Sequence, residues 1–343
     1  MHISQGYGHL KSRLSLNNGL TILSRMTRDE ILRLLREKKD YISGEQMADS
    51  LGISRSAVWK QVQALMRDGY EIESHQHRGY RLAGIPDMLY PFEVRYGLQT
   101  RVIGCKVFHF DSTSSTNIIA RQMAERGIDE GTVVIAETQA KGKGRQGRKW
   151  VTLPGGIWLS LVLKPKIDPA HAASITLLAA VSATKALREL GLEAVIKWPN
   201  DVLVNGKKIC GILTEMSAET DVVNFVVLGI GINVNNDVPL ETATSAKAEL
   251  GRRVDRLKLS QSLLEALDED YAAFRENGFL PVLWSWRRYS DTLGRPVEVT
   301  YQGETVRGVA QDVADDGSLI VKLQDGEIRK IVSGDCIHLK NLV

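Results

Sequence analysis

Residues 141–150 read Lys-Gly-Lys-Gly-Arg-Gln-Gly-Arg-Lys-Trp, and residues 197–201 read Lys-Trp-Pro-Asn-Asp. The first string has five cations, three glycines and no acid in its first nine residues. Glycine lets backbone N–H groups approach an anion closely, and Lys and Arg side chains donate charge-assisted hydrogen bonds to phosphate or carboxylate. The string lacks the GxxxxGK[ST] spacing of a Walker loop, which disfavours an ordinary P-loop nucleoside triphosphatase. It predicts an anion-binding loop, with a solvated basic loop or a nucleic-acid patch as the alternative.

The second string lies between a predicted strand and a predicted hairpin. Its Trp-Pro pair predicts a stiff apolar corner, after which Asn200 and Asp201 present oxygens suited to Mg²⁺ or a ribose. Turn residues at the end of a strand are an equally good interpretation. Lys208 begins an apolar strand, where a lysine commonly extends its charged end to solvent. Residues 229–233, Gly-Ile-Gly-Ile-Asn, would let a flat ligand lie against the backbone, although a lone GxG is weak evidence.

Composition and charge indicate an ordinary globular protein. The chain has 343 residues, 43% hydrophobic and 25% charged, and a net charge of +3 that residues 1–88 carry entirely. The length predicts two or three domains. The longest uncharged run, Pro169–Thr184, is shorter than the ~20 residues of a membrane span and predicts a buried helix. The three cysteines lie far apart without metal-ligand spacing, which fits a reducing cytosol.

The N-terminal region predicts three helices and a β-hairpin. Residues 27–30 and 43–46 have capping-box spacing, Ser54 is placed to cap a third helix, and Gly52 lies in the turn before it. Residues 71–73 and 80–82 are strand-like and flank a wing. Helix, glycine-containing turn and helix form the helix-turn-helix arrangement of DNA-binding proteins. Residues 1–25 precede this region and are expected to be a leader or a misassigned start.

The third helix presents hydrogen-bonding side chains suited to the major groove, and the wing adds a cation for phosphate or the minor groove. The predicted DNA-binding residues are Arg55, Ser56, Lys60, Gln63 and Arg78. A winged helix used for protein contact, or solvated polar side chains, are the alternatives.

The region after a linker at residues 85–87 predicts one α+β domain and then a small β domain. Strand-like and helical runs are mixed with hairpin signals such as Asn205-Gly206, which favours α+β over repeating βαβ units. From Arg295 onward, five short strands separated by glycine turns predict a small barrel. The fold class is therefore α+β and multidomain.

Residues 142–150, 197–201, 208–213 and 229–233 occur together, in this order, behind a predicted winged helix. In this combination they resemble the bifunctional biotin–protein ligase/biotin-operon repressor family. The resemblance covers about residues 26–339. It implies a winged helix-turn-helix domain at residues 26–84, a biotin/lipoate-ligase-like catalytic domain at 85–292 and a Src-homology-3-like barrel at 293–343.

The resemblance also implies roles for individual residues. The implied biotin-binding residues are Ser115, Thr116, Gln139, Lys143, Arg145, Lys208 and Gly211. The implied adenylate- and ATP-binding residues are Gly142, Gly144, Arg148, Trp150, Asn200, Asn233 and Arg256. Lys208, Arg145 and Asp201 are implied as catalytic residues, with Asp201 beside Mg²⁺. Two departures from the family pattern stand out: position 143 is Lys where Arg is usual, and residues 236–250 contain no Trp to stack on adenine.

The implied reaction joins biotin to ATP as biotinoyl-5′-AMP and then transfers biotin to a lysine of the biotin carboxyl carrier protein. The implied partners are that carrier, operator DNA of biotin genes and, when adenylate is bound, a second copy of the chain; a membrane is not among them. The implied location is the cytoplasm. A ligand-sensing transcription factor without ligase activity and a lipoate–protein ligase are the alternatives.

Overall fold

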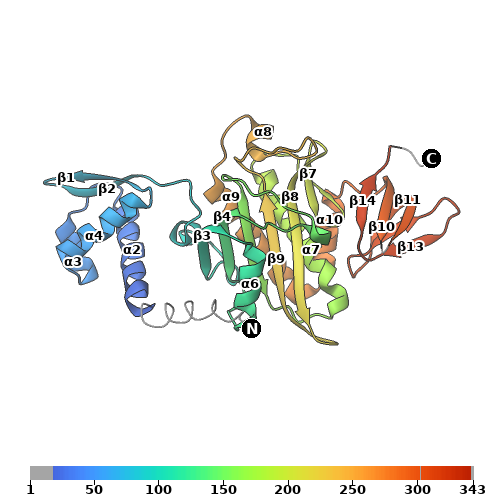
Figure 1. The fold of residues 1–343 in the computed structure, drawn as a ribbon, viewed down its shortest axis with the longest axis horizontal. Coiled ribbons are helices and arrows are strands. Elements are labelled where there is room, and N and C mark those ends of the chain that lie inside the picture. Colours follow the sequence, from blue (N-terminus) through green and yellow to red (C-terminus); the bar gives the residue numbers. More distant parts are fainter. Residues whose placement is uncertain (1–17, 302, 341–343) are drawn as a thin grey trace, which may run out of the picture. The chain divides into compact units, whose positions relative to one another are not determined.

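The computed structural model describes residues 18–301 and 303–340 (Figure 1). Residues 1–17 of the predicted leader lie outside the described residues. The chain forms two compact units that divide between Asp87 and Met88. This boundary falls at the end of the predicted linker.

The N-terminal unit contains three helices and a hairpin: α2 (Asn18–Lys38), α3 (Gly44–Leu51), α4 (Arg55–Arg67), β1 (Glu71–His75) and β2 (Gly79–Gly84). The predicted capping box of α3 is confirmed, because Ser43 Oγ accepts from Gln46 N at 3.1 Å and the Gln46 side chain accepts from Ser43 N at 3.2 Å. Gly52 ends the helix in the left-handed conformation with φ 63°. Ser54 caps α4 as predicted.

Helix α2 corrects one prediction. The capping-box spacing at residues 27–30 predicts a helix that starts at Thr27, but α2 starts at Asn18 and Thr27 lies inside it. Residues 21–26 contain neither Pro nor Gly, so nothing in the local backbone stops the helix before Thr27. A capping-box pattern marks a possible start, and the preceding residues decide whether the helix continues through it.

A seven-stranded mixed sheet forms the centre of the second unit. Its strand order is β3-β4-β5-β9-β8-β7-β6, with β3 parallel to β4 and every other pair antiparallel. The strands are β3 (Val107–Thr113), β4 (Val133–Gln139), β5 (Ile157–Leu163), β6 (Val195–Lys197), β7 (Asp201–Val204), β8 (Lys207–Ala218) and β9 (Val223–Ile232). The prediction of an α+β domain is confirmed. Asn205 and Gly206 form the β7–β8 turn with φ of 50° and 75°, as their sequence predicts.

Helices cover both faces of this sheet because side chains alternate along its strands. Val134 and Val162 pack with α6 (Thr116–Glu125), whereas their neighbours Val133 and Leu161 join the main core on the other face. The helices α7 (Ala172–Glu189), α9 (Arg256–Asn277) and α10 (Leu280–Tyr289) pack together on that second face.

Two short helices that the sequence analysis missed, α5 (Pro91–Arg95) and α8 (Ala246–Leu250), complete the domain. The run Pro169–Glu189 is long and apolar enough to cross a membrane, but most of it is buried inside the protein. This run is therefore the buried helix that the sequence predicts. Its first residues, Pro169–His171, form a 3₁₀ turn, and α7 follows directly.

The C-terminal region is a five-stranded antiparallel sheet in the order β13-β12-β11-β10-β14. Its strands are β10 (Pro296–Tyr301), β11 (Glu304–Val313), β12 (Leu319–Lys322), β13 (Ile328–Ile331) and β14 (Asp335–His338). Trp198 joins it to the central domain: the buried indole Nε1 donates to the Gly317 carbonyl at 3.1 Å, and the backbone N donates to Thr292 Oγ1 at 2.9 Å. The predicted apolar corner is thus a joint between two domains.

Candidate active site

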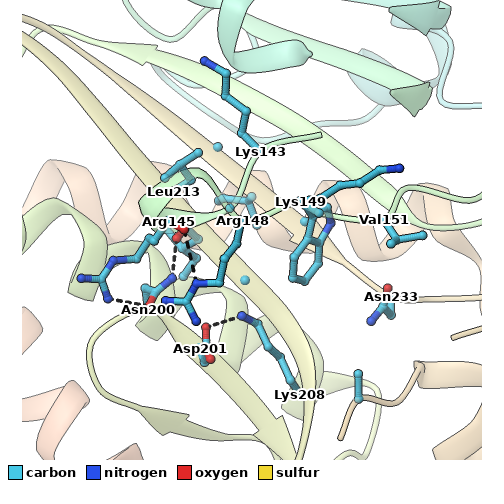
Figure 2. A pocket seen from close by; sticks show the side chains of 18 of the residues that line it. Lys143, Arg145, Arg148, Lys149, Val151, Asn200, Asp201, Lys208, Leu213 and Asn233 are labelled. Atoms are coloured by element: carbon cyan, nitrogen blue, oxygen red, sulfur yellow. Dashed lines mark hydrogen bonds and ion pairs between the residues drawn. The ribbon is translucent and has the colours of Figure 1, made fainter. Parts of the chain in front are cut away.

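A cavity of about 470 Å³ is lined by the cationic loop (residues 141–150), by strands β7, β8 and β9 and by residues of the C-terminal sheet (Figure 2). Most of the sequence-predicted site residues line it. They are Ser115, Thr116, Gln139, Lys143, Gly144, Arg145, Arg148, Trp150, Asn200, Asp201, Lys208, Gly211 and Asn233. Residues from four distant parts of the chain therefore share one cavity.

The cationic loop folds back on itself as a narrow hairpin. Trp150 N donates to the Gly142 carbonyl at 2.9 Å, and Gly144 N donates to the Arg148 carbonyl at 2.6 Å. A Cβ at Gly142 would lie 2.4 Å from the Trp150 carbonyl oxygen, so only glycine fits there. The glycines therefore allow the close backbone approach that keeps several cations on one short loop.

Two arginines of this loop bind the C-terminal sheet domain and the Trp-Pro-Asn-Asp corner. Arg145 Nη1 donates to Asn200 Oδ1 at 3.2 Å and to the Gly334 carbonyl at 3.1 Å. Arg148 forms an ion pair with Asp335. Burial lowers the pKa of Arg145, although the nearby carboxylates oppose this shift. Gly334 and Asp335 are not among the predicted site residues, because nothing in their local sequence indicates a contact with a loop almost two hundred residues away.

Lys208 and Asp201 form an ion pair inside the cavity. Lys208 Nζ lies 2.6 Å from Asp201 Oδ1, and the two side chains are 30% and 24% exposed. The ammonium group also lies 5.1 Å from the centre of the Trp150 ring, within the range of a cation–π interaction. The pair places a positive charge in a site that is partly shielded from water.

Trp150 lies against a floor made of glycine backbone. Gly211 of β8 and Gly231 of β9 are paired in register, and a Cβ at either would meet the indole at 2.9 Å or 2.6 Å. Any larger residue at these two positions would displace the ring. The indole Nε1 is buried against Gly231 and has no hydrogen-bond partner within the described residues.

Hydrogen-bonded polar side chains, here called the buried polar wall, line the part of the cavity beside Thr116 and Gln139. Gln139 Oε1 accepts from Thr116 N at 2.7 Å and from Thr116 Oγ1 at 3.1 Å. The Ser160 hydroxyl lies 2.7 Å from Thr116 Oγ1 and 2.6 Å from Asn117 Oδ1. Asn117 Nδ2 in turn donates to Glu215 Oε2 at 2.8 Å. This wall fixes the orientation of Thr116 and Gln139.

Ser160 and Asn117 support this wall but are not among the predicted site residues. Ser160 is the one polar residue of the otherwise apolar strand β5, and that exception is the signal that could have identified it. Asn117 follows Thr116 directly, and nothing in its local sequence indicates its contacts with Ser160 and Glu215.

Three family models match this chain. The biotin/lipoate A/B protein ligase family matches residues 109–233, a helix-turn-helix domain matches 27–81, and the C-terminal domain of biotin protein ligases matches 292–339. The bifunctional ligase/repressor BirA of Bacillus subtilis is 39% identical over 320 residues, which cover 91% of this chain and 98% of the relative. This chain belongs to the bifunctional biotin ligase/repressor family.

Two further comparisons agree with the family assignment. The ligase/repressor of Escherichia coli is 29% identical over 303 residues, covering 86% of this chain and 92% of the relative. The biotin protein ligase of Aquifex aeolicus, solved in complex with biotin and ATP, is similar in structure with a TM-score of 0.60 and 27% identity, covering 69% of this chain and all of that one. The family resemblance inferred from the sequence is confirmed.

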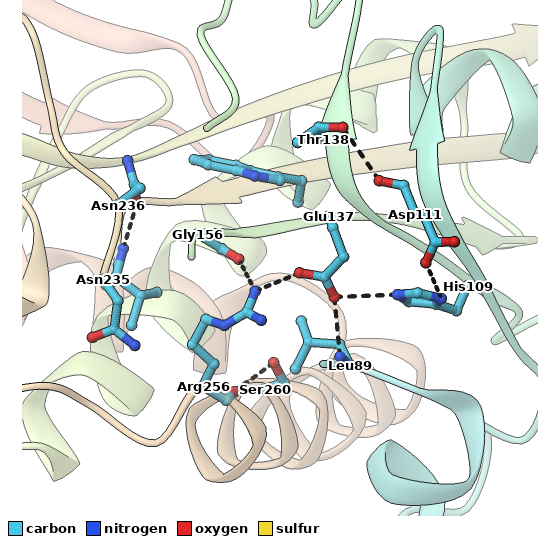
Figure 3. A network of polar contacts seen from close by, with 12 residues as sticks. Leu89, His109, Asp111, Glu137, Thr138, Gly156, Asn235, Asn236, Arg256 and Ser260 are labelled. Atoms are coloured by element: carbon cyan, nitrogen blue, oxygen red, sulfur yellow. Dashed lines mark hydrogen bonds and ion pairs between the residues drawn. The ribbon is translucent and has the colours of Figure 1, made fainter. Parts of the chain in front are cut away.

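Two residues expected to hold the nucleotide in this ligase family do not line the cavity. Gly142 lies at the base of the loop hairpin. Arg256 is 2% exposed and donates to Glu137 Oε2 at 2.9 Å and to the Gly156 carbonyl at 2.8 Å (Figure 3). The structure thus places Arg256 in a buried polar network, and its role toward the nucleotide stays a prediction.

The same network ties the start of the catalytic unit to its sheet. Glu137 Oε1 accepts from Leu89 N at 3.1 Å and lies 3.1 Å from His109 Nε2 (Figure 3). Burial would raise the pKa of Glu137, but the hydrogen bonds from His109 and Arg256 outweigh it and hold the pKa below its usual value. A carboxylate with this many partners stabilises the segment that follows the boundary between the two units.

The predicted DNA-binding residues of the N-terminal unit differ in their surroundings. Arg55, Ser56 and Lys60 are exposed on α4. Gln63 is half-buried, and its Nε2 lies 3.7 Å from Met66 Sδ. Arg78 of the wing is exposed but forms an ion pair with Asp40 at 3.0 Å and lies over the Tyr41 ring.

Proposed function

We propose that this protein is an ATP-dependent biotin–protein ligase that also represses biotin genes, with biotinoyl-5′-AMP as corepressor. Its substrate protein is the biotin carboxyl carrier protein of a biotin-dependent enzyme. The observation that carries the ligase assignment is the cavity itself, where the glycine floor, the buried polar wall and the Lys208–Asp201 pair face the cationic loop. The family membership supports both activities.

In this proposal biotin lies in the cavity beside the Trp150 ring, with its ring end toward the polar wall. Thr116 and Gln139 supply hydroxyl and amide groups for the ureido ring, and Ser115 lies beside them. Lys208 donates a charge-assisted hydrogen bond to the carboxylate at the other end. Lys143 and Gly211 complete the set of biotin-binding residues.

The first step joins two anions. A biotin carboxylate oxygen attacks the α-phosphorus of ATP, a new oxygen–phosphorus bond forms, and pyrophosphate leaves. In the second step the neutral amine of a carrier lysine attacks the carbonyl of this mixed anhydride, an amide forms, and AMP and a proton leave. The substrates supply both nucleophiles, so the protein acts by positioning and by electrostatics.

The carboxylate and the triphosphate repel each other in the first step, and the cations of the cavity reduce this repulsion. Lys208 and Arg145 are the proposed catalytic residues, since both line the cavity and both carry charge toward it. On the nucleotide side, the proposed contacts are Gly142, Gly144, Arg148, Trp150, Asn200, Asn233 and Arg256. A loop that excludes water also protects the anhydride from hydrolysis.

Mg²⁺ is proposed to arrive with ATP and to meet Asp201. Within the described residues, no cluster of three or more His, Cys, Asp or Glu could hold a metal by itself. Mg²⁺ commonly binds through one or two carboxylates together with substrate phosphates, and the Asp201 carboxylate fits that need. When bound, the ion neutralises charge on the triphosphate.

The proposed domains are a winged helix at residues 26–84, the catalytic domain at 85–292 and a Src-homology-3-like barrel at 293–343. The five-stranded antiparallel sheet with short connections supports the barrel assignment. Arg55, Ser56, Lys60, Gln63 and Arg78 are the proposed contacts with operator DNA. The proposed location is the cytoplasm, and the form bound to DNA is a homodimer.

One experiment separates the ligase from its two rivals. The protein is incubated with ATP, Mg²⁺ and either biotin or lipoate, together with a biotin carboxyl carrier domain, and the carrier is weighed by mass spectrometry. A mass gain of one biotin on the carrier supports the proposal, and a gain of lipoate selects a lipoate ligase. No gain selects a sensor without ligase activity. A carrier whose acceptor lysine is replaced by Arg is the matched control.

The repressor activity requires a coupling between adenylate and DNA. Adenylate must bind the dimerising conformation more tightly than the other conformation, because a ligand shifts an equilibrium only by its differential affinity. We therefore expect biotin with ATP to promote self-association and binding to an inverted-repeat operator, and the carrier to oppose both by consuming adenylate. Sedimentation and operator gel shifts, each with and without biotin and ATP, test this. Equal association and equal DNA affinity in both conditions would contradict the coupling.

A further inference from the structure

Trp59 is exposed in the middle of α4, the helix that carries the proposed DNA-binding face. Its side chain is 54% exposed. Residues three and four positions apart lie on one side of a helix, so Ser56 and Gln63 share this face with Trp59, and Lys60 is its exposed neighbour in the chain. An aromatic ring therefore stands among the polar side chains proposed to meet DNA.

The fold of the N-terminal unit does not need this ring in its core. The core side chains of α4 are Val58, Val62 and Leu65, which are fully buried, as is Met47 of α3. An indole left half in water adds little burial to the stability of the unit. A single exposed aromatic ring is normal on a protein surface, so its neighbours and its place on α4 decide what it can contact.

The charge of α4 indicates which partner fits. The helix carries Arg55, Lys60 and Arg67 and has no acidic residue. Its N-terminal end, at Arg55, also bears the positive end of the helix dipole. This surface attracts a polyanion and disfavours a basic partner.

Among base edges in the major groove of DNA, the C5-methyl group of thymine is the apolar feature. Polar side chains such as those of Lys60 and Gln63 gain nothing from it, whereas an indole does. We propose that Trp59 is a specificity-determining residue that contacts a thymine C5-methyl group in the operator. This inference rests on the proposed DNA-binding function.

The test exchanges thymine for deoxyuridine, which removes only the methyl group. The full-length protein, with biotin, ATP and Mg²⁺, first recovers a duplex from a library of random sequences. Each thymine of that duplex is then replaced singly by deoxyuridine, and the affinities of the parent and of Trp59→Ala are measured. We expect the parent to lose about fourfold at one position or its symmetry mate, the effect of burying one methyl-sized group. Trp59→Ala should bind the thymine and deoxyuridine duplexes equally.

Matched variants separate this contact from general weakening. Lys60→Ala should weaken binding to both duplexes and leave the thymine preference intact. Trp59→Phe, which keeps an aromatic ring, should retain about half of that preference. Circular dichroism of each variant verifies that the N-terminal unit is folded.

Two results overturn the proposal: a parent that shows no thymine preference at any position, or a folded Trp59→Ala variant that keeps it. The latter result together with altered self-association in the absence of DNA would identify the Trp59 face as a protein interface. If the parent recovers no duplex at all, the DNA-binding function fails and this inference fails with it. Normal DNA binding without the thymine effect overturns the Trp59 contact alone.

Discussion

Replacing Lys208 with Met should remove one charge from the cavity while keeping most of the side chain's length. The ammonium group lies 2.6 Å from Asp201 Oδ1 and next to the Trp150 ring. In the proposed reaction it donates a hydrogen bond to the biotin carboxylate, and a bond to a charged group contributes about 1.5–3 kcal/mol. Because the side chain is 30% exposed, water weakens this bond and the lower half of the range applies. Adenylation should therefore slow by roughly 10- to 45-fold.

The assay is the rate of biotinoyl-5′-AMP formation, measured as kcat/KM for biotin at saturating ATP. Lys207→Met is the matched control, because Lys207 is the exposed neighbour on the same strand and does not line the cavity. The control should stay within about twofold of the parent, since its charge lies outside the site. Thermal unfolding of both variants verifies that the fold is retained. A Lys208→Met variant that forms adenylate at the parental rate would refute the contact between Lys208 and the reacting carboxylate.

Three further predictions concern the loop, the buried network and the C-terminal domain. Arg145→Ala should release bound adenylate about tenfold faster, because the hydrogen bonds from Arg145 to Asn200 and to the Gly334 carbonyl are lost. Filter binding of labelled adenylate measures the release rate, and an unchanged rate would contradict this prediction. Glu137→Gln should lower the free energy of unfolding by about 3 kcal/mol, since it removes the carboxylate that balances the buried Arg256 charge; a loss below about 1 kcal/mol in urea unfolding would exclude that role. Burial lowers the pKa of His338 to about 4. As the pH falls, this imidazole therefore becomes protonated near pH 6.5 in the unfolded chain but only near pH 4 in the folded chain. Stability should therefore fall as the pH drops from about 6.5 to 4, and His338→Gln should flatten this part of the Tm profile.

Features that depend on neighbouring residues could be predicted from the sequence. The cap at Ser43 and the hairpin at Asn205-Gly206 are decided by hydrogen bonds and φ preferences within a few positions, and both appear as predicted. The winged helix, the mixed α+β domain and the family followed from such local signals taken in order. The start of α2 shows the limit of this approach, because a correct capping pattern at residues 27–30 lies inside a longer helix.

Contacts between side chains that are distant in the chain depend on how the molecule folds. Lys208 pairs with Asp201 because two strands of one hairpin place them together, whereas Arg148 reaches Asp335 only after the C-terminal sheet has docked. The partners of Arg256 come from β4 and from the residue before β5, more than ninety positions away. Sequence spacing carries no record of such contacts, because they depend on how the whole sheet and its helices pack. The chemistry of each residue was therefore visible in the sequence, and its partners were visible only in the fold.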